Sequence, residues 1–155
     1  MGFCPDDLND IREFTLNNIQ DTEINESNIH GFGLFATNPI KKGSILCNLD
    51  GQIIEQGIYN QICKQLKPSI IAVEKYLFME CNYINETEIL ARTFRTKYSY
   101  INHSFRPKVV IKYFPIRIVA IVDIELGDEL TIDYRCEPLT KEYLSRPEKQ
   151  FLQGV

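Results

Sequence analysis

Residues 126–134 read LGDELTIDY, a polar turn followed by a strand-like run that ends in a tyrosine. Glycine and aspartate favour turns, whereas leucine, threonine, isoleucine and tyrosine are common in strands. The stretch therefore predicts a turn and then a strand over residues 129–134. Tyr134 is an aromatic hydroxyl at the end of that strand, where a side chain can either complete the core or face a site.

Short runs rich in Ile, Val, Tyr and Phe recur on both sides of this stretch, each bounded by turn residues. They predict further strands at 23–26, 44–48, 76–81, 109–114 and 117–122. Helical patterns are few and predict short helices at 6–15 and 56–67, the second ending before Pro68. Near the end, Ser145 and Glu148 resemble a capping box that opens one more short turn. The expected fold class is mostly β with peripheral short helices.

The bulk composition fits one globular domain. The chain has 155 residues, of which 44% are hydrophobic and 25% charged, and its apolar runs are too short to cross a bilayer. The first ten residues lack a basic start and an apolar stretch, so no secretory signal is expected and the predicted location is intracellular. Five cysteines at irregular spacing predict neither a disulfide framework nor a zinc site, and reduced, mostly buried thiols are the expected state.

The net charge of −4 is concentrated at the start of the chain, because residues 1–30 contain seven acids and one arginine. No basic stripe interleaved with aromatics is present, so direct nucleic-acid binding is not expected. The acidic flank is either a solvated face or a surface that attracts a basic peptide.

Two further segments combine strongly polar groups with apolar neighbours. Residues 28–36, NIHGFGLFA, contain paired glycines that permit a tight turn and a close approach of the backbone to a ligand. Residues 98–107, YSYINHSFRP, place an Asn-His-Ser run beside aromatic and apolar residues, where polar groups need hydrogen-bond partners. Only two histidines occur, which excludes a multi-histidine metal site, and no Gly-x-Ser-x-Gly elbow supports a serine hydrolase.

In this order and spacing the three segments resemble the SET-domain family, which transfers methyl groups from S-adenosylmethionine to protein lysines. The matching residues are 30–36 for the opening motif, 102–104 for the central one and 127–134 for the closing one. The resemblance implies a β-clip-like fold of small curved sheets with a pseudo-knot that brings residues near 31, 102 and 134 together. It divides the chain into an N-terminal flank at 1–21, expected to be helical, a SET domain at 22–135, and a short helical tail at 136–155 packing near the site.

The resemblance also assigns roles. Tyr134 would be the catalytic positioning residue, and the cofactor would be held by His30, Gly31, Phe32, Gly33, Tyr76, Asn102 and His103. Tyr98, Tyr100 and Ile132 are candidates for the wall of a substrate channel, and no metal ligand is expected. The implied partner is a lysine-containing protein or peptide, which the acidic flank would suit if it is basic, and neither a membrane nor direct nucleic-acid binding is expected.

The chain departs from the family pattern at several positions. Leu49 and Ile132 stand where many members have aromatic residues, Lys108 replaces the usual asparagine after the central motif, and no cysteine cluster follows Tyr134. An alternative is therefore a catalytically silent SET module that binds a peptide or partner protein. The tail residues Leu139, Tyr143, Leu144, Phe151 and Leu152 are expected to close the site by apolar burial in place of a metal cluster.

Overall fold

A computed structural model gives the structure of the protein and describes residues 8–66, 80–138, 144–145 and 147–153. The helices are α1 (Leu8–Phe14) and α2 (Gln56–Leu66), with short 3₁₀-helices η1 (Lys97–Tyr100), η2 (Tyr134–Cys136) and η3 (Pro147–Gln153). The strands are β1 (Thr22–Glu26), β2 (Phe32–Ala36), β3 (Ile45–Asn48), β4 (Gln52–Glu55), β5 (Glu80–Tyr83), β6 (Glu88–Arg92), β7 (Asn102–His103), β8 (Val109–Lys112), β9 (Arg117–Ala120) and β10 (Glu129–Ile132).

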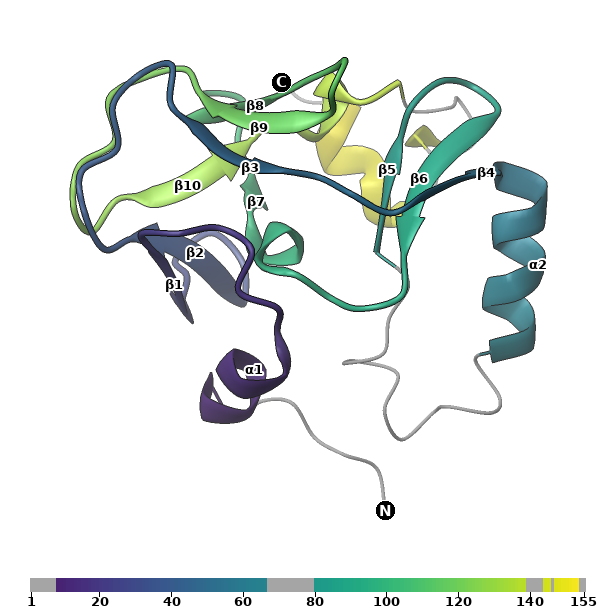
Figure 1. Cartoon of the computed structure of the whole chain (residues 1–155), viewed down its shortest axis with the longest axis horizontal. Helices are drawn as coiled ribbons and strands as arrows, with labels where there is room; N and C mark the ends of the chain where they lie inside the picture. Colours follow the sequence, from purple (N-terminus) through teal and green to yellow (C-terminus); the bar gives the residue numbers. More distant parts are fainter. Residues whose placement is uncertain (1–7, 67–79, 139–143, 146, 154–155) are drawn as a thin grey trace.

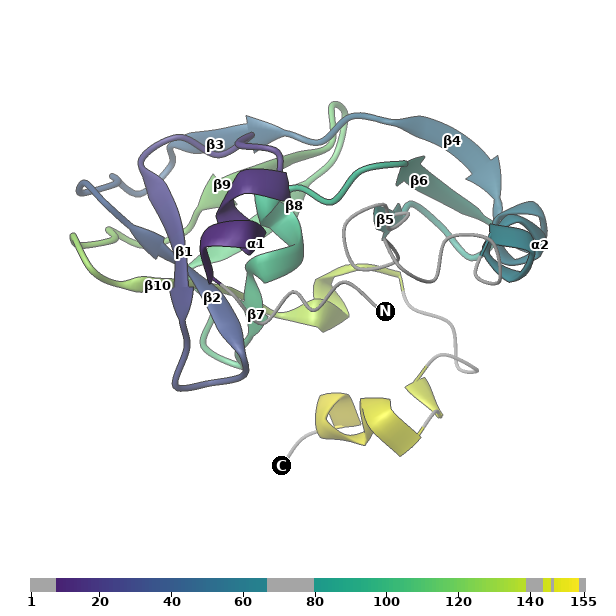
Figure 2. The same ribbon diagram turned by 90° about the horizontal axis from the view of Figure 1, so that it is seen from below.

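These strands form three small sheets with the orders β1-β2-β10-β7, β3-β9-β8 and β4-β6-β5. Figure 1 shows them around the centre of the molecule, with α2 beyond β4 at one end and α1 below β1 and β2. Figure 2 shows η3 on the side of β7 and η2, apart from the other helices. The described chain is therefore mostly β with peripheral short helices, as the sequence predicts.

The first sheet brings distant segments of the chain together. β10 pairs with β2 in antiparallel fashion, with Leu130 opposite Leu34, and with β7 in parallel fashion, with Ile132 opposite His103. A parallel neighbour requires a long crossover, and here the chain between β7 and β10 forms the β8–β9 hairpin. Residues 102–103 are thereby fixed beside the strand that leads into Tyr134. The threading expected of a pseudo-knot stays a prediction.

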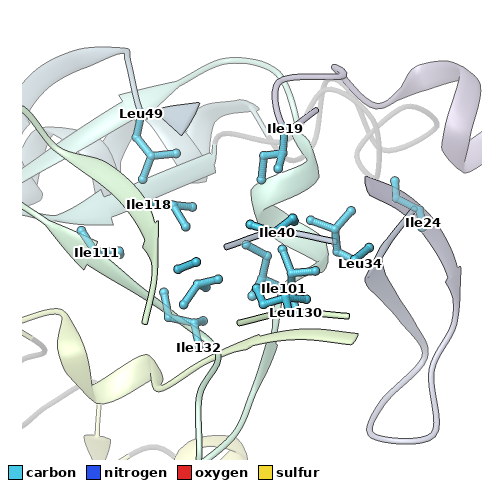
Figure 3. Close-up of a cluster of buried hydrophobic side chains, with 14 of the residues drawn as sticks. Ile19, Ile24, Leu34, Ile40, Leu49, Ile101, Ile111, Ile118, Leu130 and Ile132 are labelled. Carbon is cyan, nitrogen blue, oxygen red and sulfur yellow. The ribbon is translucent and has the colours of Figure 1, made fainter. Parts of the chain in front are cut away.

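The core lies where the sheets meet. Leu34, Leu130 and Val109 are fully buried, and Ile101, Ile118 and Ile132 surround the same centre (Figure 3). Alternation along the strands accounts for part of this pattern, since side chains at i and i+2 share a face. β10 is an exception because Leu130, Thr131 and Ile132 are all buried, so it has protein on both faces. The site described below is built on the ends of this buried strand.

The sequence-predicted elements agree with these bounds to within a few residues. The predicted helix at 56–67 is α2, and the predicted strand at 129–134 is β10, which ends two residues earlier because the chain turns into η2. The prediction for 28–36 as a turn was incomplete, because its second half is strand β2. β4, β6 and β7 were also missed. The predicted strand at 76–81 is described only from residue 80.

Candidate active site

The turn between β1 and β2 depends on a glycine conformation. Gly31 has a φ of +47°, in the left-handed region that favours glycine, and its carbonyl accepts a 2.9 Å hydrogen bond from the backbone N–H of Ser27. A Cβ added at Gly31 would meet no atom within 4 Å, so the turn is open on that side. At Gly33 a Cβ would lie 2.3 Å from Oε2 of Glu129. A side chain at Gly33 would therefore have to displace the Glu129 carboxylate, and the expectation that this glycine also lets a ligand approach the backbone stays a prediction.

Asn102 ties this turn to the central strand. Its Nδ2 lies 2.9 Å from Oε2 of Glu129, 3.2 Å from Oγ of Ser27, and 3.1 Å from the backbone oxygens of both His30 and Phe32. The hydroxyl of Ser27 donates to the same carboxylate, at 2.8 and 2.9 Å to its two oxygens. The amide nitrogen of Asn102 is thus committed to the fold, and a bound molecule can use only its other end.

Tyr134 is anchored at two points. Its hydroxyl donates to the backbone oxygen of Ile101 at 3.0 Å, and its backbone N–H donates to Nδ1 of His103 at 3.1 Å. An imidazole nitrogen that accepts a hydrogen bond carries no proton, so the neutral ring has its proton on Nε2. Nε2 is buried and has no hydrogen-bond partner within the described part of the chain. Burial lowers the pKa of His103, while the Asp133 carboxylate, 3.8 Å from Nδ1, opposes this shift.

Aromatic rings surround His103. The centroid of Phe105 lies 4.5 Å from that of the imidazole, Tyr134 lies at 5.1 Å, and Phe151 of η3 lies at 5.5 Å. Phe151 also contacts Tyr134, with their centroids 6.3 Å apart. The next residue, Leu152, is only 1% exposed. The end of the chain therefore packs directly on the two residues that the central and closing motifs contribute.

A partly buried carboxylate, that of Glu137, follows Tyr134 by three residues. Glu137 accepts hydrogen bonds from the Tyr98 hydroxyl at 2.6 Å, the Tyr83 backbone N–H at 2.8 Å and the Asn82 amide at 3.1 Å. Burial raises the pKa of Glu137, and the three donors counteract part of that increase. Burial and the adjacent Glu137 charge raise the pKa of Tyr98 well above its usual value. Tyr98 is therefore held as a neutral hydroxyl donor.

A second acid positions the helix that precedes the central motif. Glu80 is 3% exposed, forms an ion pair with Arg92, and accepts from both the backbone N–H and the hydroxyl of Thr96 at 2.9 and 2.6 Å. It also accepts from Ser99. Thr96 caps η1, which leads into Ile101 and Asn102. Glu80 thus fixes the segment whose backbone oxygen receives the Tyr134 hydroxyl.

Comparison with known proteins identifies the family in which the three motifs occur together. The family model described as "SET domain" matches residues 31–135, which include all three motifs except His30. The chain belongs to the SET-domain family. The architecture agrees with that assignment, since short strands in small sheets make up most of the regular secondary structure of the described SET domain.

Several proteins named as methyltransferases are similar to this SET domain. "Histone-lysine N-methyltransferase, H3 lysine-4 specific" of Kluyveromyces lactis is 32% identical over 123 residues, which cover 75% of this chain and 12% of that protein. "Histone-lysine N-methyltransferase set1" of Dictyostelium discoideum is 29% identical, with 70% and 8% covered. "Histone-lysine N-methyltransferase ATX2" of Arabidopsis thaliana is 28% identical, with 71% and 10% covered. The chain thus spans about a tenth of the length of these relatives.

The structure brings most of the sequence-predicted site residues together around β2, β7 and η2. Tyr134 and His103 are in contact, and the backbone of His30 and Phe32 is bonded to Asn102. Tyr76 lies outside the described residues. The assignment of cofactor and catalytic roles within this group stays a prediction.

The three channel candidates lie in different surroundings. Tyr98 bonds to Glu137, whereas the ring of Tyr100 faces the guanidinium of Arg95, 6.0 Å from the ring centroid. Ile132 is 1% exposed and belongs to the hydrophobic core, so the structure does not place it on an open wall. Of the three, Tyr98 is the one joined to the polar groups next to η2.

Sequence reasoning missed the acids that organise the SET-domain site: Glu80, Glu129 and Glu137. Each is an ordinary charged residue in a short polar segment, and its place in the structure depends on pairing with residues 12 to 102 positions away. The one local signal in the sequence was the position of Glu129 at the start of the apolar, strand-like run 129–132. Within the described residues no group of three or more His, Cys, Asp or Glu side chains is arranged to hold a metal ion. The described helices are also too short or too polar to cross a membrane.

Proposed function

We propose that this chain transfers a methyl group from S-adenosylmethionine to the side-chain amine of a protein lysine inside the cell. The observation that carries the proposal is the junction of the three motifs at Tyr134. Tyr134 bonds to Ile101 and His103, and the residue between them, Asn102, bonds to the turn that contains Gly31. The names of the similar proteins support the same reaction class.

The residues at this junction fit the proposed cofactor. Nε2 of His103 is a buried donor that lacks an acceptor among the described residues, and adenosine carries nitrogen acceptors. Oδ1 of Asn102 accepts no hydrogen bond from the described residues and can receive an ammonium donor. The Gly31 turn, open on the side where a Cβ would project, allows close approach of a ligand. When bound, the cofactor supplies a methyl group on a positively charged sulfur.

The chain's own part in the reaction is to hold and orient the acceptor. The Tyr134 hydroxyl directs its proton to the Ile101 oxygen, so its own oxygen can act only as an acceptor toward an approaching amine. A lysine has a pKa near 10.4 in water, and apolar surroundings lower it and so favour the neutral, nucleophilic form. No general base is assigned. Alignment of amine and methyl is then the main contribution. In well-oriented reactions such alignment lowers the activation barrier by about 7 kcal/mol or more.

Two measurements on the full chain test this proposal. Titration calorimetry should show saturable binding of S-adenosylmethionine, weakened in the Asn102→Ala variant. Incubation with radiolabelled cofactor and a cell lysate, followed by mass spectrometry, should identify a mass increase of one or more methyl groups on lysine. Absence of both binding and transfer by a folded protein would reject the proposal.

A catalytically silent binding module is the second candidate, and one observation favours it. Leu49 and Ile132, which replace aromatic residues of the family pattern, are 5% and 1% exposed and pack in the core. They cannot form the wall that those aromatics would provide. Cofactor binding with no methyl transfer to any lysate protein would support this second candidate.

A further inference from the structure

A cavity of about 610 Å³ opens beside the segment that follows Tyr134. Its walls come from the β4-β6-β5 sheet, the β8–β9 turn and residues 135–138, and they are largely apolar, including Ile53, Ile84 and Ile116. Two lining side chains are open to solvent, since Phe114 is 97% and Ile53 is 61% exposed. The volume lies within the range of ligand-binding pockets, and the cavity can be reached from outside.

Of the two charged residues that line the cavity, only the base has an ionic partner among the described residues. Glu137 and Arg135 are its charged lining residues. Arg135 is held by Asp133, with bonds of 2.7 and 2.9 Å, and its guanidinium lies 4.5 Å from the Phe105 ring centroid. Its charge is therefore balanced at that place. Glu137 receives only neutral donors and forms no salt bridge with a described residue.

The nearest cationic neighbour in the network, Arg92, lowers the pKa of Glu137 but forms no ion pair with it. Arg92 bonds to Asn82, which in turn bonds to Glu137, but Arg92 is already paired with Glu80. Glu137 is thus left without an ion pair among the described residues. A cationic ligand with an apolar stem matches such a cavity, because the stem fills the apolar walls and the charge meets the unpaired acid.

The spacing relates the cavity to Tyr134. η2 runs from Tyr134 to Cys136, and a 3₁₀-helix rises about 2 Å per residue, so the backbone at Glu137 lies on the order of 6 Å from that at Tyr134. An extended peptide advances about 3.3 Å per residue. We propose that the cavity binds an arginine or lysine side chain of the substrate, about two residues from the methylated lysine, and that Glu137 determines this specificity. This proposal rests on the proposed function for the position of the acceptor, but not for the binding of the cation.

Peptide binding can be measured without catalysis. The probes are Ac-Ala-Arg-Ala-NH₂, Ac-Ala-Ala-Ala-NH₂ and Ac-Ala-Glu-Ala-NH₂, titrated into the full chain carrying ¹³C-labelled isoleucine methyl groups. We expect the arginine peptide alone to shift the methyl signals of Ile53, Ile84 and Ile116. Glu137→Gln should weaken this binding at least about fivefold, whereas the exposed acid Glu125, changed to Gln as a matched control, should leave it unchanged.

A second pair of variants keeps the test decisive if Glu137→Gln fails to fold. Ile53 is exposed at the rim, so Ile53→Lys and Ile53→Glu should both fold, with the first weakening and the second strengthening arginine-peptide binding. Equal affinity for the three peptides, or no difference between the two Ile53 variants, overturns the proposal. Arginine-selective binding in a protein that transfers no methyl group would sustain the cavity assignment and reject the enzyme. If the rate of methyl transfer to a series of lysine peptides does not depend on a neighbouring arginine, the enzyme assignment stands and the cavity assignment is rejected.

Discussion

Asn102 serves the fold as a donor, and its two amide protons are shared among four oxygens. Ser27, His30, Phe32 and Glu129 supply those oxygens, from segments that lie 27 to 75 positions away. Such a cluster is stable only if the central group donates, since the surrounding atoms are acceptors or, in the case of Ser27, already donate to Glu129. The side chain is therefore chosen for chemistry as well as for volume.

This donor role gives a prediction that separates chemistry from packing. Asn102→Ala should lower the free energy of unfolding by about 1–3 kcal/mol, the cost of leaving buried polar groups unpaired. Asn102→Asp keeps the shape but places a second carboxylate beside that of Glu129, so it should be at least as destabilising as the alanine variant. Urea denaturation at pH 7.5 measures both. If the aspartate variant is as stable as the parent, the amide nitrogen is not the group that matters.

The hydroxyl of Tyr134 gives the second prediction. Tyr134→Phe keeps the ring against His103 and Phe151 and removes the bond to the Ile101 oxygen. We expect a loss of about 1 kcal/mol in stability, near-parental cofactor affinity and a fall in kcat of at least about tenfold, because a group that orients the amine acts in the transition state. Melting temperature, calorimetry and initial rates report the three quantities. A variant with unchanged kcat would show that the hydroxyl only supports the fold.

At the scale of elements, β10 was predictable and the sheet around it was not. The LGDELTIDY stretch combines a turn with strand-forming residues, so it specifies β10 locally. The two-residue strand β7 has no such signal, and it exists because Asn102 and His103 meet Thr131 and Ile132 across 29 positions of chain. The motifs predicted that these segments converge, through resemblance to a family. They did not reveal the acids that hold them, because burial of a charge depends on partners distant in sequence.

The tail is the element whose role can be tested most directly. Phe151 is 47% exposed yet touches both His103 and Tyr134, and the neighbouring Leu152 is buried. We propose that η3 closes over a bound cofactor. Phe151→Ala should then weaken S-adenosylmethionine binding by about three- to tenfold, the equivalent of one aromatic contact, with little effect on melting temperature.

The matched control for this variant is Phe94→Ala, since Phe94 is similarly exposed at 51% and belongs to none of the contacts described for the site. Tighter cofactor binding by Phe151→Ala would identify η3 as an obstruction instead of a cover. A truncation that tests the tail should therefore keep all residues up to Pro138. A chain ending at Cys136 would also lose Glu137 and its bonds to Tyr98, Tyr83 and Asn82, and so would not isolate the effect of η3.

At the scale of the whole molecule, the core and the site share the same strands, so protonation in the site should affect global stability. His103 sits between the core strand β10 and the tail, with a pKa lowered by burial below its usual value of 6.5. Near pH 6 the unfolded chain then binds more protons at this residue than the folded chain does. The stability contributed by neutral His103 is present in full above pH 6.5 and is lost as the pH falls through the folded pKa.

We therefore predict that the free energy of unfolding decreases from pH 8 to pH 5, and that part of the decrease disappears in His103→Gln. The Asp133 carboxylate favours protonation of His103 and so reduces the effect, while Arg135 opposes protonation. Glu137 has the opposite sign, because its pKa is raised and its contribution is lost as the pH rises through the folded pKa. For this reason the informative quantity is the difference between parent and variant, measured by urea denaturation at each pH with His30 present in both. Parallel curves for the two proteins between pH 8 and pH 5 would show that His103 takes up its proton equally in the folded and unfolded states, and that burial under the tail does not control its charge.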